Sequence, residues 1–140
     1  MNKFKLAFKY LVLLLIGGMI YVLIELLFRG RSHFTMFILG GVCFVSVGLI
    51  NEVLPWDTPF QLQMLLGGSI ITVLEFISGC IFNLYFGLGI WDYSDQPGNI
   101  LGQICPLFSL LWVFLSCLAI LLDDYLRYLI FNEEKPHYTL

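Results

Sequence analysis

Four long apolar segments are the feature that most constrains how this 140-residue chain can fold. We expect helices at about residues 10–28, 34–54, 61–86 and 105–122, each near or above the roughly 20 apolar residues that cross a bilayer. Only 12% of the residues are charged, whereas soluble domains carry about 25%. The sequence therefore predicts an all-α membrane protein, with residues 1–140 forming a single transmembrane domain built as a four-helix bundle in the lipid bilayer.

Basic residues at the start of the chain bear on topology. Lys3, Lys5 and Lys9 precede the first apolar segment, as in a signal peptide, but no small-x-small cleavage site follows it. We interpret the segment as a retained first helix. Most of the Lys and Arg residues lie on the side of the two termini, and Arg29 and Arg31 lie on the other. The positive-inside rule then predicts a multi-pass protein of the cell membrane with both termini and a 123–140 tail in the cytoplasm.

A carboxylate in the middle of the third apolar segment is the clearest anomaly. Glu75 shares one helical face with Thr72, Gly79 and Asn83. An ionised carboxylate at this depth costs roughly 2.5–3.5 kcal/mol, so Glu75 should be paired, protonated or facing water. Two interpretations stay open: a site for an ion, proton or cation, and a structural polar network that joins the first three helices.

A polar, glycine-rich segment at residues 87–104 separates the third and fourth helices. Its glycines and its proline break any regular helix, and Asn99 and Gln103 are spaced for one face of a short helix. We predict a structured or re-entrant hairpin folded against the bundle. Trp91 and Tyr93 alone would fit an anchored interfacial loop. The concentration of hydrogen-bonding groups instead favours the wall or lid of a polar pocket.

Charged pairs at the helix ends have a plainer interpretation. Glu25 and Arg29 are four residues apart, so we expect an ion pair near the membrane surface and favour it over a ligand site. Asp123 and Asp124 precede Arg127 at a similar spacing. Asn51-Glu52 ends the second helix, where the side chains can reach the headgroups. The glycines of this helix permit close contact with a neighbouring helix.

The candidate site draws on the first helix, the third helix and the hairpin. Its proposed ligand- or ion-binding residues are Glu25, Arg29, Glu75, Asn83, Trp91, Asp92, Tyr93 and Asn99. The four cysteines form no CxxC pair and have no Cys/His spacing that suits zinc, so we interpret them as packing residues and expect no metal and no cofactor. The sequence contains no Lys/Arg-dense patch, so we expect no nucleic-acid partner.

Several motifs resemble one family of small bacterial membrane proteins. They are Arg29-Gly30, Gly40-Gly41, Asn51-Glu52, the TVLEFISG run of residues 72–79, Asn83, the WDYS of residues 91–94 and the P-x-N-x-x-G-Q-I-C of residues 97–105. From about Phe28 to Arg127 the chain resembles the putative ABC-transporter type IV permeases, to which vertebrate transmembrane protein 229 is distantly related. The resemblance implies a multi-span protein of the bacterial plasma membrane. Many members carry Gly-Pro and Pro-x-Tyr-Gly soon after Arg-Gly. This chain reads SHFTMFILGG there, so nothing that rests on that segment is carried over.

Three classes of function remain after these observations. The chain has no GxxxxGK[ST] phosphate loop, so a transporter component without an ATPase of its own would work with unidentified transporter subunits. The alternative is a small self-contained carrier or binding protein, a homodimer that takes a cation or amphiphile. There Glu75 would act with Glu25 or Glu52, and Trp91 and Tyr93 would suit a quaternary amine. An intramembrane enzyme comes last, because no catalytic pairing of side chains is evident and we expect no enzymatic activity.

Overall fold

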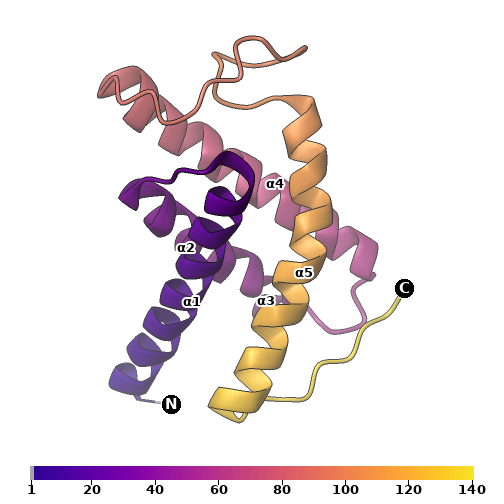
Figure 1. Ribbon diagram of the computed structural model, residues 1–140. Coiled ribbons are helices and arrows are strands. Elements are labelled where there is room, and N and C mark those ends of the chain that lie inside the picture. Colours follow the sequence, from indigo (N-terminus) through magenta and orange to yellow (C-terminus); the bar gives the residue numbers. More distant parts are fainter. Residues whose placement is uncertain (1) are drawn as a thin grey trace.

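The computed structural model describes residues 2–140, and the regular secondary structure of these residues is all helical (Figure 1). The elements are α1 (Lys3–Arg29), α2 (Phe34–Gly48), α3 (Ile50–Val53), α4 (Phe60–Gly79), the π-helical turn η1 (Cys80–Tyr85) and α5 (Pro106–Phe131). The short elements α3 and η1 continue α2 and α4. Four helical segments among the described residues are thus long and apolar enough to cross a membrane. The predicted all-α class with four spans is confirmed.

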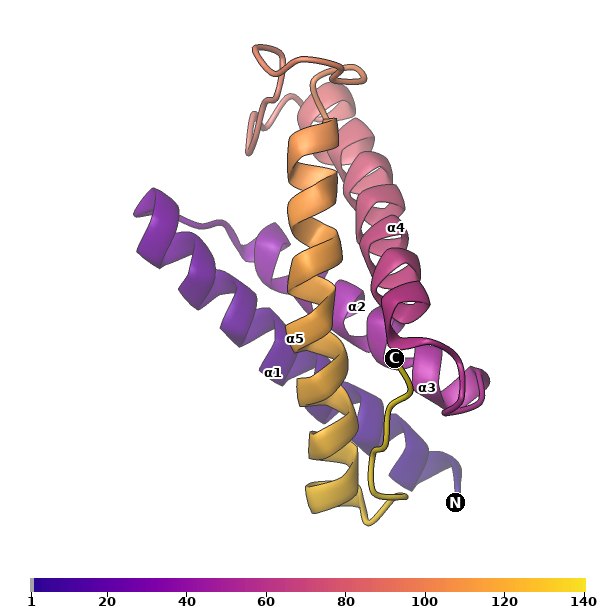
Figure 2. The same cartoon turned by 90° about the vertical axis from the view of Figure 1, so that its right-hand side faces the viewer.

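The helices are arranged as two pairs. Helix α1 packs along α2, and α4 packs along α5, while α2 also contacts α4 and α5 and so joins the pairs. Figure 2 shows α4 and α5 running side by side, with α1 inclined to both. Within residues 2–140, the only helix on which α1 packs extensively is α2. Helices α1 and α5 therefore face each other without close packing along their length.

Glycines bring the first pair of helices together. A Cβ atom on Gly41 would lie 2.5 Å from the carbonyl oxygen of Leu14, and one on Gly18 would lie 2.5 Å from the carbonyl oxygen of Phe37. Backbone atoms cannot move aside as the end of a flexible side chain can. This close approach is the one that small residues allow between membrane helices, where lipid supplies no hydrophobic driving force.

Two helix boundaries differ from the prediction. Helix α1 begins at Lys3 rather than at about residue 10, because the Asn2 side chain caps it by accepting a hydrogen bond from the Lys5 N–H (2.8 Å). Helix α5 continues past the predicted end at Leu122 as far as Phe131. Its charged residues beyond Leu122 are paired with one another along the helix and do not end it. The predicted 123–140 tail is thus helical as far as Phe131, and the segment after the last helix is residues 132–140.

The loop between η1 and α5 is ordered by its own hydrogen bonds. The Tyr93 N–H donates to the Gly102 carbonyl (2.7 Å), which closes the loop as a hairpin would. The predicted short helix through Asn99 and Gln103 is absent from this segment. Asn99 instead stabilises turns, because its side chain donates to the Gln96 carbonyl (2.9 Å) and accepts from the Gly102 N–H (3.0 Å).

The close contact between α1 and α2 gives a direct test. Gly41→Ala places a Cβ against the Leu14 carbonyl oxygen, so we expect it to lower the free energy of unfolding by about 1–3 kcal/mol. Unfolding in mixed micelles, followed by circular dichroism, measures the loss. Ser69→Ala, at an exposed position of α4, serves as the control and should change stability little. Equal stability of the two variants would contradict the proposed packing.

Candidate functional site

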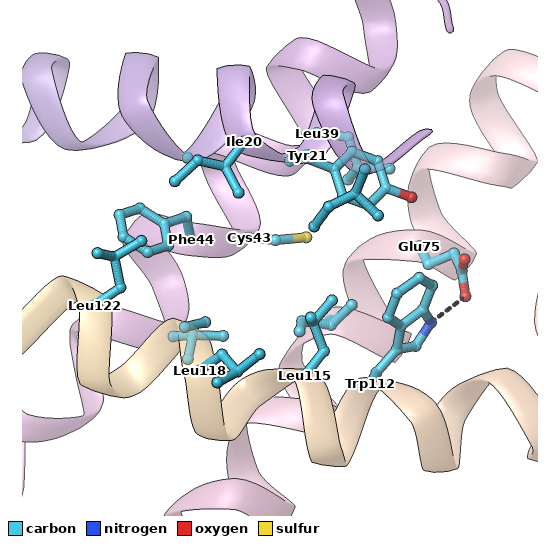
Figure 3. Close-up of a pocket in the computed structure, with 16 residues that line it drawn as sticks. Ile20, Tyr21, Leu39, Cys43, Phe44, Glu75, Trp112, Leu115, Leu118 and Leu122 are labelled. Atoms are coloured by element: carbon cyan, nitrogen blue, oxygen red, sulfur yellow. Dashed lines mark hydrogen bonds between the residues drawn. The ribbon is translucent and has the colours of Figure 1, made fainter. Parts of the chain in front are cut away.

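A cavity of about 170 Å³ lies between α1, α2, α4 and α5 (Figure 3). Almost all of its wall is apolar. Tyr21 reaches it from α1, Cys43 from α2 and Leu118 from α5, while Glu75 and Trp112 lie together at one end. The cavity is thus an apolar chamber with a carboxylate at one extremity.

Glu75 is held in place by two neutral donors. The Trp112 indole N–H donates to Glu75 Oε1 (3.1 Å), and the Tyr93 hydroxyl donates to Oε2 (2.9 Å). The residue is only 6% exposed. Among residues 2–140, no cationic side chain lies within ion-pair distance of this carboxylate. A buried carboxylate without a cation is costly when ionised, so the site favours a proton or a cationic ligand.

Tyr93 connects the loop to this carboxylate. Its ring stacks on Phe108, with centroids 4.9 Å apart and the planes inclined by 19°. Burial and the neighbouring Glu75 carboxylate raise the pKa of Tyr93 above its ordinary value. The phenol therefore stays protonated over the physiological pH range and remains a hydrogen-bond donor. The loop after η1 thus supplies part of the Glu75 site.

The η1 residue Asn83 and the other hairpin residues of the predicted site have structural partners. Asn83 donates to Gln103 Oε1 (2.8 Å) and accepts from the Ile90 N–H (2.7 Å). The indole N–H of Trp91 donates to the Gln103 carbonyl (3.1 Å). Asp92 is exposed, and the Ser94 hydroxyl and N–H donate to it, which holds the pKa of Asp92 below its usual range. Of the eight predicted residues, the structure brings only Glu75 and Tyr93 together by a hydrogen bond at the cavity.

The Glu25–Arg29 ion pair is present, with an N–O distance of 3.1 Å. The Arg29 guanidinium also donates to the Ile90 carbonyl (2.9 Å), so it ties the end of α1 to the loop before α5. These two residues border a second hollow of about 150 Å³ that does not include Glu75. His33 lies beside it and caps α2, because its side chain accepts a hydrogen bond from the Thr35 N–H (3.3 Å).

A buried ion cluster at the opposite end of the cavity was missed by the sequence analysis. Lys9 of α1 pairs with Glu52 of α3, and with Glu133 after α5 at 2.8 Å. Arg127 of α5 pairs with Glu133 at 2.9 Å and with the two preceding aspartates. We call this set the terminal cluster; its members are Lys9, Glu52, Asp123, Asp124, Arg127 and Glu133.

Some signals for this cluster were present in the sequence. The pairing of Arg127 with Asp123 (2.7 Å) and with Asp124 follows from their helical spacing and is confirmed. The role of Glu52 was misjudged, because its carboxylate binds Lys9 and the Tyr10 hydroxyl (2.6 Å) instead of reaching headgroups. In the sequence, Lys9 indicates only the orientation of the chain in the membrane. Its partners lie more than 40 residues away, so no local spacing could reveal them.

Neutral groups complete the terminal cluster. Asp124 Oδ2 accepts from the Asn51 amide (2.6 Å) and from the Tyr138 hydroxyl (2.8 Å). Burial and the Asp124 carboxylate raise the pKa of Tyr138 above its ordinary value, so the phenol donates. Within residues 2–140, no group of three metal-ligating side chains is placed to hold a metal ion. The acidic groups thus serve ion pairs and hydrogen bonds.

Removal of the central cation tests the cohesion of the terminal cluster. Arg127→Met leaves Asp123 and Asp124 buried without their cation, so we expect the free energy of unfolding to fall by about 3–5 kcal/mol. Chemical unfolding in micelles measures the effect. Arg31→Met is the control, because Arg31 is exposed and should contribute little. A loss below about 1 kcal/mol in Arg127→Met would show that the pairs are solvated.

Comparison with known proteins gives one match. The sequence matches the family described as "Putative ABC-transporter type IV" over residues 8–135. A comparison with curated proteins and one with solved structures found no match. The family and the four span-length helices support a multi-pass membrane protein that is a transporter component. Because the match covers nearly all of the chain, the protein belongs to the putative ABC-transporter type IV family.

Proposed function

We propose that this chain is the membrane subunit of a transporter and binds a cationic amphiphile in the cavity between α1, α2, α4 and α5. The carrying observation is the Glu75 carboxylate, which has two neutral donors, no cationic partner among residues 2–140, and a position at the end of an apolar cavity. An ammonium headgroup would supply the missing positive charge. The apolar wall would receive the hydrocarbon part of the same molecule.

The length of the cavity suits such a ligand. Trp112 and Leu122 both line it on α5, and they are ten residues apart. At about 1.5 Å per residue, this corresponds to about 15 Å along the helix. An extended alkyl chain lying along α5 would keep its headgroup near Trp112 and Glu75. Indole and phenol rings beside a carboxylate also suit a quaternary amine through cation–π contact.

Entry from the bilayer is favoured by the exposure of the cavity wall. Ile20 of α1 and Leu118 and Leu122 of α5 line the cavity, yet each is at the surface, and Leu118 is 64% exposed. These residues flank the gap between α1 and α5, where the two helices do not pack. An amphiphile could thus pass from lipid into the cavity without crossing water.

The energy source would lie outside this chain. Its 140 residues contain no phosphate-binding loop of the GxxxxGK[ST] type, so ATP hydrolysis would come from a partner subunit. The second candidate is a self-contained carrier, either a single chain or a homodimer. It is favoured by the exposure of Ile20, Leu118 and Leu122 on the cavity wall, which gives an amphiphile direct access from lipid.

Ligand binding tests the role of Glu75. We expect Glu75→Gln to weaken binding of dodecyltrimethylammonium by about 30-fold or more, since loss of one partner of a buried charge pair costs about 2–5 kcal/mol. Calorimetry in lipid nanodiscs measures the affinity. A neutral amphiphile of equal chain length should bind both proteins alike. Glu134→Gln, outside the cavity, is the control variant.

Unchanged affinity of Glu75→Gln for the cationic amphiphile would remove the proposed site, provided that circular dichroism shows an intact fold. A different variant tests the chamber itself. Ala119→Phe adds a ring to the cavity wall, so it should weaken binding of the cationic and the neutral amphiphile alike.

Native mass spectrometry of the gently solubilised protein separates the two candidate functions. An ATPase that stays bound to the chain is the result expected for the transporter subunit. A monomer or homodimer that carries an amphiphile and no further protein would support the self-contained carrier. Wild-type protein that carries neither an ATPase nor an amphiphile, together with unchanged binding in Glu75→Gln, would contradict both candidate functions.

A further inference from the structure

We propose that the C-terminal segment Glu133–Leu140, here called the strap, is a gate over the end of the cavity that lies opposite Glu75. Opening of this gate would connect the cavity to water on the face of the terminal cluster. The inference concerns access to the cavity and does not depend on which ligand the cavity binds. Its test therefore fails or succeeds independently of the test of Glu75.

The position of the terminal cluster is the first argument. Leu122 is the last residue of α5 that lines the cavity, and Asp123, the next residue, begins the cluster. On α1, Lys9 lies about two turns before Gly17, the first cavity residue of that helix. The cavity is therefore bounded at one end by Glu75 with Trp112 and at the other end by the terminal cluster.

The way in which α1 is joined to α5 is the second argument. These helices do not pack closely on each other, but Glu133 of the strap contacts Lys9 of α1 at 2.8 Å and Arg127 of α5 at 2.9 Å. Glu52 of α3 makes a parallel but longer contact with Arg127, at 3.6 Å. Glu133 is thus the bridging acid that lies outside the helices, and it can leave without a helix moving.

The third argument is that the strap is attached by side-chain and loop contacts and is not part of a helix. It runs back beside α5 toward the start of α4 (Figure 2), where the Thr139 carbonyl accepts from the Phe60 N–H (2.7 Å). Tyr138 packs on Phe60, with ring centroids 5.0 Å apart, and donates to Asp124. Trp56 donates to Glu134 (3.0 Å). Trp56 also packs on His137 and Tyr138, and Pro136 is buried. Release needs the loss of these contacts, but it leaves every helix intact.

The charges that face Glu133 allow its release without leaving a buried charge unpaired. Lys9 and Arg127 are the cations of the cluster, and the acids facing them are Glu52, Asp123, Asp124 and Glu133. When Glu133 departs, Lys9 keeps Glu52 and Arg127 keeps both aspartates. Each cation therefore retains a carboxylate partner in the open state, and no isolated buried charge is created.

Cys43 is a native reporter of this gate, because its side chain lines the cavity. The experiment uses the full chain in liposomes, with Cys80, Cys105 and Cys117 replaced by serine. A membrane-impermeant quaternary-ammonium methanethiosulfonate on both faces modifies Cys43 at a rate set by water access. We expect Glu133→Gln to raise that rate about tenfold, which corresponds to the loss of about 1.4 kcal/mol of closing free energy. Tyr138→Phe, which frees the strap from Asp124, should also raise it.

Glu134→Gln is the matched control: the glutamine oxygen can still accept from Trp56, and residue 134 contacts neither Lys9 nor Arg127. A second reporter protein, in which Cys105 is retained and Cys43, Cys80 and Cys117 are replaced by serine, detects unfolding, because Cys105 is 2% exposed and lies outside the cavity wall. Faster modification of Cys43 with Cys105 still protected supports the gate. Unchanged modification of Cys43 in Glu133→Gln, an equal rise in Glu134→Gln, or a parallel rise at Cys105 would overturn it.

Discussion

The cost of placing charge beside hydrocarbon governs how this bundle is put together. Lys9, Arg127 and the aspartates beside it are almost fully buried, and each is paired. These pairs draw α1, α3, α5 and the strap to one point, although α1 and α5 scarcely pack elsewhere. The cavity follows from that arrangement, because helices joined by polar contacts at their ends leave space between their apolar middles.

Sequence patterns predicted those features that depend on local spacing. Apolar length located the spans, and i,i+4 spacing found the pairs of Glu25 with Arg29 and of Asp123 with Arg127. A carboxylate at mid-span identified Glu75 as anomalous, but its donors Tyr93 and Trp112 lie 18 and 37 residues away. Such partners depend on how the helices cross, which periodicity along a single helix does not encode.

Of the hairpin residues predicted to line a polar pocket, Tyr93 is the one that hydrogen-bonds to Glu75. Asn83, Trp91 and Asn99 are turn and loop residues whose hydrogen bonds order the segment before α5. An ordered loop was needed to hold the Tyr93 hydroxyl against Glu75 at 2.9 Å. These residues therefore support the candidate site at a distance, and a count of polar groups could not separate the supporting residues from the one that contacts the carboxylate.

The two ends of the cavity differ in a way that explains why a cation would bind at only one of them. Every carboxylate of the terminal cluster already lies beside Lys9 or Arg127, so an entering ammonium group would have to displace a bound cation. At Glu75 no such competitor is present among residues 2–140, and the donors are neutral. We therefore propose that Glu75 recognises the cation, whereas Glu133 with Lys9 and Arg127 closes the cavity. Under this proposal, a cation at Glu75 would leave the pairs that hold α1 to α5 undisturbed, and release of Glu133 from those pairs would leave the Glu75 site unaltered.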